Sequence, residues 1–224
     1  QPRLSQFGVA TDRRRQLQQD RIRPHPPCAA AQAQEFPQRP MRIIVAFTTG
    51  TAADIVARQL AAKLTDSLGK QVIVENRDGA AGTIGTGLAA RATPDGHTLL
   101  IASPSVIISP LLIKNLPYDV ARDFAPVSLL ATAPLVLLTQ ANGSIQTLAD
   151  LVKEAKARPE GLSYGTPGIG TPHHISGEML QKATGIKLTQ ITYRGTAPSV
   201  NDLLAGQIPL IIATTISIMP LLQS

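Results

Sequence analysis

The 224-residue sequence predicts an α/β fold made of two lobes. From Phe36 onward, short β-branched runs alternate with segments whose apolar residues recur at helical spacing. This alternation is found on both sides of a long apolar stretch at 127–139, and strands separated by helices form mostly parallel sheets with right-handed crossovers. The length also suits two small domains, since domains usually contain about 100–150 residues. We therefore predict a leading segment at 1–35, a first lobe at 36–130 and a second lobe at 131–224.

The first lobe is predicted to contain three strands, each followed by a helix. The expected strands are 41–47, 71–75 and 97–102. The expected helices are 53–68, a segment from the glycine-rich turn at 79–87 through 92, and 105–113. The helix at 53–68 is the clearest, because Ile55, Leu60 and Leu64 share one face and Gly69 follows its last turn.

The second lobe repeats this pattern after a predicted long strand at 127–139, which Pro134 interrupts and which crosses between the lobes. The expected helices are 147–157, 172–183, 197–205 and 216–222. The expected strands between them are 162–165, 188–192 and 207–212. Thr147 and Asp150 have the spacing of a capping box at the start of the first of these helices.

Composition and charge exclude several classes of partner. Aromatic residues make up 3% of the chain and Trp is absent, which argues against a base-stacking nucleic-acid surface. Six arginines and three acidic residues lie within 1–35, so half of the net charge of +6 lies in that segment and the body is only mildly basic. The single cysteine, Cys28, excludes an internal disulfide and a cysteine-based zinc site. We expect no nucleic-acid partner.

The segment at 1–35 is rich in Gln, Arg and Pro and is predicted to be disordered. Its end, Ala31-Gln32-Ala33, is similar to the cleavage region of a secretory leader, but 21–27 supplies charged residues and prolines where the apolar part should be. Two interpretations stay open: a leader altered upstream, or an accidental alanine-rich patch.

The predicted strands end in loops rich in Gly, Ser, Thr and Pro that open helices. In open α/β sheets ligands bind beyond the carboxyl ends of strands, and helix N-termini offer unpaired N–H groups to anions. Each loop alone fits an ordinary turn, but the series favours an anion-binding cleft. The loops are 48–51, 82–85, 103–105, 165–171, 193–196 and 213–215.

Three side-chain types in these loops have two interpretations each. Arg194 either pairs with a ligand carboxylate or is solvated. Asp54 either favours its helix dipole or contacts a ligand amine. Of His173 and His174, one lines or caps the cleft while the other faces solvent, and neighbours on a helix point apart, so we expect no metal site.

No catalytic constellation is present: the sequence has no G-x-S-x-G elbow and no paired carboxylates in the loops, and nothing in the spacing of Ser103 and the His pair supports a dyad. We therefore expect no enzyme and no cofactor. An alternative is an α/β nucleotide-binding enzyme that uses the turn from Gly79 to Gly85, although its spacing differs from G-x-G-x-x-G.

Ten segments in order, from about Phe36 to the last residue, resemble the substrate-binding receptors of tripartite tricarboxylate transporters, the Bordetella uptake gene family. The segments are PMRIIV at 40–45, DIVAR at 54–58, VENR at 74–77, GTIG at 82–85, PDGHTLL at 94–100, LPYD at 116–119, DFAPV at 123–127, GTPGIGT at 165–171, YRGTAP at 193–198 and DLLAGQ at 202–207.

The resemblance implies a periplasmic, two-lobed binding protein of the type 2, Venus-flytrap architecture. It implies a receptor that closes on a small di- or tricarboxylate and presents it to the membrane subunits of the transporter. A carboxylate sensor not coupled to transport stays open. The implied ligand-binding residues are Phe47, Thr48, Thr49, Gly50, Ala53, Asp54, Thr83 and Ser103 in the first lobe, and Thr166, Gly170, Thr171, His173, Tyr193, Arg194, Gly195 and Thr214 in the second.

Three departures from the family pattern matter. The first loop usually carries Pro and paired Gly, whereas here it is FTTGT at 47–51. Many relatives have Asp at the positions of Pro209 and Ala213, and its absence at Ala213 argues against an amino-acid ligand. Relatives also continue beyond Ser224 to complete the first lobe, so the sequence resembles a truncated member with an incomplete first lobe and an atypical N-terminus.

Overall fold

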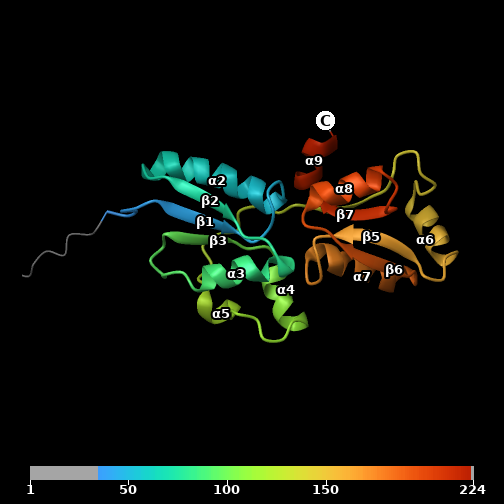
Figure 1. Ribbon diagram of the computed structural model, residues 1–224, viewed down its shortest axis with the longest axis horizontal. Coiled ribbons are helices and arrows are strands. Elements are labelled where there is room, and N and C mark those ends of the chain that lie inside the picture. The colour runs from blue at the N-terminus through green and yellow to red at the C-terminus, as the bar shows by residue number, and fades with distance from the viewer. Residues whose placement is uncertain (1–34, 223–224) are drawn as a thin grey trace, which may run out of the picture. The chain divides into compact units, whose positions relative to one another are not determined.

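A computed structural model of the chain describes residues 35–222, and the residues from Phe36 onward group into one compact unit (Figure 1). The disorder and the leader-like patch predicted before Glu35, together with Cys28, lie outside the described residues. The unit contains a three-stranded and a four-stranded sheet, each flanked by helices. The prediction of an α/β fold with mostly parallel sheets is confirmed.

The first sheet has the order β2-β1-β3, with all strands parallel. Its strands are β1 (Met41–Val45), β2 (Val72–Asn76) and β3 (Thr98–Ile101). Its helices are α2 (Ala52–Leu68), α3 (Thr83–Ala90), which follows the 3-10 turn η1 (Ala80–Gly82), α4 (Ser105–Leu112) and the short α5 (Val120–Asp123).

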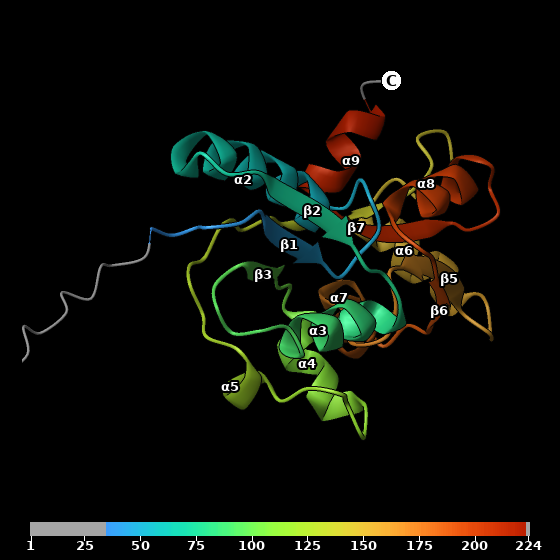
Figure 2. The same cartoon turned by 60° about the vertical axis from the view of Figure 1, so that its left-hand side comes forward.

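Strand β1 is buried on both faces. Met41, Ile43 and Val45 alternate along it and pack against Ala57 and Ala61 of α2, which completes one core cluster. Helices α3 and α4 lie on the other side of the sheet (Figure 2). The parallel strands therefore all end at the same edge, which positions the loops that follow them.

The second sheet has the order β4-β7-β5-β6, with β4 antiparallel to β7 and the other pairs parallel. Its strands are β4 (Leu135–Leu138), β5 (Leu162–Thr166), β6 (Leu188–Thr192) and β7 (Leu210–Thr214). Its helices are α6 (Leu148–Lys156), α7 (Pro172–Thr184), α8 (Thr196–Leu204) and α9 (Thr215–Leu222).

Alternate residues of β7 enter two different cores. Leu210 and Ile212 join the cluster that includes Leu151 of α6, whereas Ile211 and Ala213 join the cluster that includes Val200 of α8. A strand buried on both faces has a nearly continuous apolar sequence, as IPLIIA at 208–213 does.

Two of the predicted strands differ most from the structure. The predicted strand at 127–139 is wrong for 127–134, because only β4 forms a ladder, and that ladder is with β7. Strand β7 starts and ends later than 207–212, so Thr214 and Thr215 pass directly from strand to helix without a loop. Helix α5 was not expected. The capping box at α6 is confirmed: Thr147 Oγ1 accepts from the Asp150 N–H at 3.1 Å, and Asp150 accepts from the Thr147 N–H at 2.9 Å.

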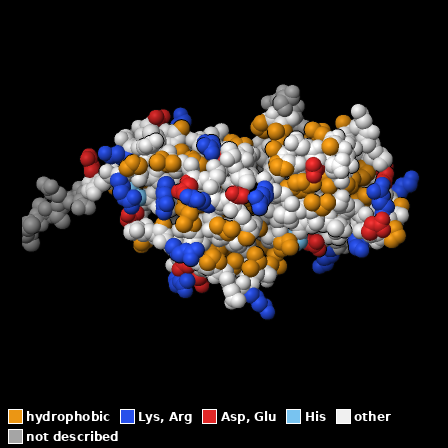
Figure 3. Space-filling view, in the orientation of Figure 1, with side chains coloured by type: hydrophobic (Ala, Val, Ile, Leu, Met, Phe, Trp, Pro, Cys, Tyr) orange, Lys and Arg blue, Asp and Glu red, His pale blue; other side chains and the backbone are white. Residues whose placement is uncertain are grey.

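Several large apolar side chains are exposed. On α4, Ile107 and Leu111 are 68% and 83% exposed, and in the following segment Val127 and Leu129 are 87% and 81% exposed. Figure 3 shows apolar side chains gathered around α4. Among the described residues, none of the helices has both the length and the apolar character needed to cross a membrane.

Candidate binding site

Loops from the two lobes touch at three glycines of the second lobe. A Cβ atom placed on Gly195 would lie 2.4 Å from Oγ1 of Thr48, and one on Gly170 would lie 3.4 Å from Oγ of Ser109. A Cβ atom on Gly168 would lie 3.5 Å from Cβ of Ala81. All three glycines have positive φ values, between 84° and 132°, so the absence of a side chain gives both the backbone conformation and the close approach.

The first-lobe loop at 46–51 connects β1 to α2 and includes the predicted residues Phe47, Thr48, Thr49 and Gly50. Oγ1 of Thr51 donates to the Thr48 carbonyl at 2.9 Å, and the Gly50 N–H donates to Asp54 at 3.0 Å. Phe47 packs into the core beside α2 and near Gly82, and the predicted residue Ala53 packs into the same core. Hydrogen bonds inside the loop and to the first turn of α2 therefore hold its conformation.

The second-lobe loop at 166–171 is built around two buried hydroxyls. Oγ1 of Thr166 accepts from the Gly168 N–H at 3.1 Å and also from Gln190. Oγ1 of Thr171 donates to the Gly168 carbonyl at 2.7 Å and accepts from the His174 N–H at 3.4 Å, which caps α7. These bonds hold Gly168 and Gly170 against the first lobe. The sequence did not indicate Gln190 as part of this loop. It pairs with Tyr164 in the β5–β6 ladder, and Tyr164 precedes Thr166 by two residues on the same face of β5.

In the loop before α8, the side chains of Tyr193 and Arg194 point to different surroundings. Tyr193 turns toward the second-lobe core, where its hydroxyl donates to Asp202 at 2.7 Å, and its ring lies against Gly165. Burial and the bond to Asp202 raise the pKa of Tyr193 to about 12, so it stays neutral. Arg194 is exposed and forms no ion pair within the described residues. A cation without a partner therefore stands beside Gly195, where the lobes touch.

Two helix starts at this site leave N–H groups free. Thr51 and Gly195 precede α2 and α8, and neither gives a side-chain cap. Within the described part of the chain, the following backbone N–H groups have no acceptor: those of Thr48, Thr49, Ala52, Ala53, Gly195, Thr196 and Ala197. By contrast, α6 has a full capping box. Unpaired N–H groups at helix N-termini attract anions, so an anion would find free donors on both sides of this contact.

The other predicted site residues use their hydroxyls within their own lobe. Thr83 is buried and donates to the Ala80 carbonyl at 3.0 Å. Ser103 bonds to Ser105, and Thr214 bonds to Ser217 at 2.8 Å. These hydrogen bonds shape the loops in which the three residues lie.

The two adjacent histidines differ in their partners, but neither faces solvent as expected, because both side chains are only partly exposed. Nδ1 of His173 is buried without a partner, whereas Nδ1 of His174 accepts from the Gly170 N–H at 3.4 Å. Within residues 35–222 no cluster of three metal-ligating side chains is found. His173 is a neutral, partly buried ring at the N-terminus of α7.

Stability should fall between pH 7.5 and pH 5 because of His173. Burial lowers the pKa of His173 to about 4 from 6.5, so the unfolded chain binds the proton first. The contribution is complete above pH 6.5 and is lost as pH falls toward 4, which amounts to roughly 2 kcal/mol at pH 5. Asp95, whose pKa is held at about 2 by the His97 N–H and Arg39, loses its contribution only at lower pH.

The measurement is the free energy of unfolding in urea at both pH values for the wild type and His173→Gln. We expect the variant to lose about 2 kcal/mol less than the wild type over this interval. An equal loss in both proteins would contradict the assignment.

The glycine-rich turn from Gly79 to Gly85 serves packing in this structure. A Cβ atom on Gly85 would lie 2.5 Å from the Arg77 carbonyl oxygen and 2.8 Å from Cα of Ala46. Gly82, at φ +92°, approaches the Phe47 ring. The turn thus brings α3 onto β1.

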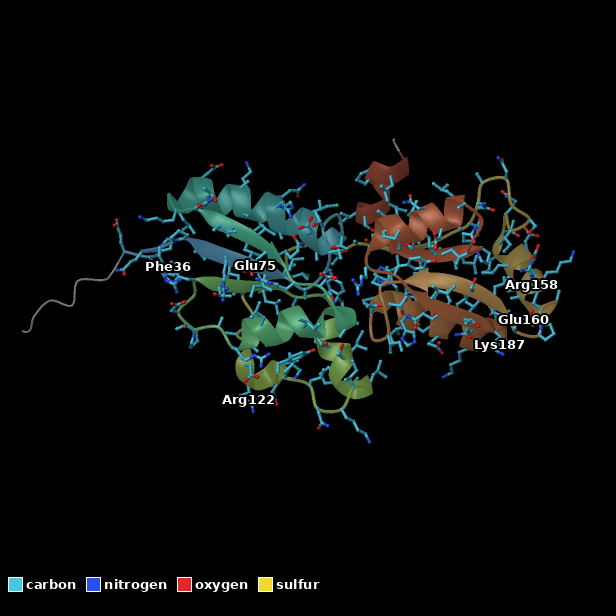
Figure 4. All side chains as sticks on the ribbon, in the orientation of Figure 1. Phe36, Glu75, Arg122, Arg158, Glu160 and Lys187 are labelled. Atoms are coloured by element: carbon cyan, nitrogen blue, oxygen red, sulfur yellow. The ribbon has the colours of Figure 1, made fainter. Side chains whose placement is uncertain are left out.

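Two hollows of the second lobe lie apart from these loops. One, of 340 Å³, is lined by Leu137, Thr139, Ile145, Gln146, Thr147, Leu148, Leu151 and Leu180. The other, of 630 Å³, is lined by Gln140, Arg158, Glu160, Gly161, Leu162, Ser163, Thr189, Gly206, Gln207, Ile208 and Pro209. The larger one lies at the amino ends of β5, β6 and β7, where Figure 4 labels Arg158 and Glu160. It is therefore at the opposite strand ends from the loops described above.

The chain has two α/β lobes whose strand-end loops touch, and free N–H groups lie on both sides of this contact. This arrangement is typical of two-lobed binding proteins. The profile of the tripartite tricarboxylate transporter family receptors matches residues 56–224, and the chain belongs to this family. It is a family of receptors, so the chain is not classed as an enzyme, and the nucleotide-binding alternative is not supported.

Named relatives and solved structures agree with this assignment. The chain is 39% identical over 194 residues to Protein BugT of Bordetella pertussis, and this match covers 86% of the chain and 58% of BugT. It is similar to the periplasmic binding protein BugD (36% identity, TM-score 0.77), to an R. palustris protein solved with adipate (33%, 0.80) and to MatC of Rhodopseudomonas palustris with bound malate (28%, 0.74). Each of these structural matches covers 84% of the chain and 63–64% of the solved protein. The chain thus spans just over half the length of its curated relatives.

Proposed function

We propose that this protein is a periplasmic receptor that binds a small di- or tricarboxylate between its two lobes and delivers it to the membrane subunits of a tripartite tricarboxylate transporter. The observation that carries the proposal is the set of unpaired N–H groups on both sides of the contact between Thr48 and Gly195. A carboxylate accepts several such hydrogen bonds at once, and charge-assisted bonds are about twice as strong as neutral ones. Arg194, exposed and unpaired beside Gly195, supplies positive charge.

Two structural relatives support the ligand class, since one was solved with adipate and the other with bound malate. Both molecules are dicarboxylates with two anionic ends. Two groups of donors, one in each lobe, match such a ligand better than a molecule with one charged end. The ligand-binding residues given above for the two lobes remain part of this proposal, with Asp54 acting through the loop that it holds and not by contact with the ligand.

Calorimetric titration of the purified protein with malate, adipate and citrate tests the proposal. We expect saturable binding of at least one acid, with no binding of glucose or ATP. Binding of a sugar or nucleotide with no response to any of the acids would overturn it. The transport step is tested separately by uptake of labelled acid in cells with and without the gene, and unchanged uptake would contradict that step.

A further inference from the structure

The carboxylate of Asp54 lies directly beneath the first-lobe loop and is only 2% exposed. Its Oδ2 atom accepts from the Gly50 N–H at 3.0 Å and from Nε of Arg58 at 3.1 Å. Its Oδ1 atom accepts from Nδ2 of Asn76 at 2.9 Å and lies 3.0 Å from Nη2 of Arg58. An ionised carboxylate offers about four acceptor positions, and here three accept hydrogen bonds while the Arg58 guanidinium lies against the remaining one.

Asn76 holds the other end of the same loop. Its Nδ2 atom donates to the Phe47 carbonyl at 3.0 Å as well as to Asp54, and its Oδ1 accepts from Arg58 at 3.0 Å. The loop is therefore fixed at Phe47 and at Gly50. The free N–H groups of Thr48 and Thr49 lie between these two anchors.

The charge state of Asp54 fits this arrangement. Burial alone raises the pKa of the Asp54 carboxyl, but the bonds from Arg58, Gly50 and Asn76 outweigh burial and hold that pKa below its usual value. Asp54 is thus ionised at neutral pH, and the neighbouring Arg58 guanidinium balances its charge. An anionic ligand can then approach the loop without meeting an unbalanced carboxylate.

We propose that Asp54 is a positioning residue: with Asn76 and Arg58 it holds the N–H groups of Thr48 and Thr49 ready for a carboxylate, and it has no acceptor left for a ligand amine. The proposal deepens the proposed function and rests on it for its binding readout. It also bears on ligand selection: Asp54 does not distinguish a ligand that carries an amine from one that carries a hydroxyl at the same position.

Asp54→Asn is the decisive variant, because it replaces one acceptor oxygen by a donor that faces other donors. Malate and L-aspartate form the matched ligand pair, since they differ only by a hydroxyl in place of the ammonium group. We expect the variant to weaken both by the same factor, roughly tenfold or more. Glu154→Gln is the control, because Glu154 forms the same i,i+4 pair with Arg158 at 3.0 Å on α6, and it should leave both affinities unchanged.

Two further measurements keep the test independent of folding and of the ligand. Asn76→Ala removes the Phe47 anchor together with the bonds of Asn76 to Asp54 and Arg58, but it leaves the Gly50 anchor in place, so it should weaken malate by a smaller factor. Hydrogen exchange of the Gly50 amide without ligand should be at least roughly tenfold faster in Asp54→Asn than in the wild type.

A selective loss of L-aspartate in Asp54→Asn would show that Asp54 contacts an amine and would overturn the proposal. Malate affinity within twofold of the wild type would overturn it as well. If the wild type binds none of malate, adipate, citrate and L-aspartate, the proposed function fails, and the exchange rate of Gly50 alone decides the positioning role: an unchanged rate overturns it.

Discussion

Replacing Gly195 by alanine should abolish tight carboxylate binding while the protein stays folded. The new Cβ atom would lie 2.4 Å from Oγ1 of Thr48, and the backbone at φ +106° and ψ 177° is a conformation that essentially only glycine adopts. Rotation of Thr48 relieves part of the clash, but the strain at the start of α8 remains. We expect the lobes to be kept apart and the affinity for malate or adipate to fall at least roughly 30-fold, which corresponds to about 2 kcal/mol.

Gly185→Ala is the matched control, measured beside it by calorimetry and thermal unfolding. Gly185 also has a positive φ, +69°, but a Cβ atom there has no neighbour within 4 Å. This variant should lose about 1 kcal/mol of stability, the usual cost of alanine in a left-handed cap, with unchanged affinity. Equal affinities in Gly195→Ala and the wild type would show that ligand binding does not need the contact between the Gly195 and Thr48 loops.

Replacing Gly85 by alanine should cause the largest loss of stability. Its Cβ atom would meet the Arg77 carbonyl oxygen at 2.5 Å and Cα of Ala46 at 2.8 Å. Both are backbone atoms, so the clash is relieved only if α3 moves away from β1. Overpacking of this kind costs about 1–3 kcal/mol, and we expect the upper end because no side chain can rotate away.

The measurement is the midpoint of thermal unfolding, which should fall by roughly 5–10 °C for a domain of this size. Gly69→Ala, at the C-terminal end of α2, where nothing lies within 4 Å of the new Cβ, should lower it by no more than about 4 °C. If the two variants were equally stable, Gly85 would not be a packing position.

Most helices and strands were predictable because their apolar periodicity is local. The helix at 53–68 was expected within one residue of α2, since Leu60, Leu64 and Leu68 repeat on one face and Gly69 adopts the left-handed cap. The segment 127–134 was not predictable in this way. Its apolar sequence is typical of a strand, but a strand forms only where a neighbouring strand supplies hydrogen bonds. The local sequence pattern does not show which strands pair.

The binding loops were predictable in position, because parallel strands all end at one edge of their sheet. What each side chain does there was not. For example, the hydroxyl of Tyr193 donates to Asp202 in α8, nine residues along the chain, a bond that the loop sequence did not indicate. Asn76 and Arg58 come together with Asp54 only through the pairing of β2 beside β1 and the turn of α2, so no spacing in the sequence joins all three.

The most direct test of a carboxylate site between the lobes is a titration of the ¹⁵N-labelled protein with adipate, followed by amide chemical shifts. We predict that Thr49 and Gly50 of the first lobe and Gly170 and Gly195 of the second lobe shift together, along one binding curve. Shifts confined to Ser163, Thr189 and Gln207 would place the ligand in the larger hollow of the second lobe and would contradict the account.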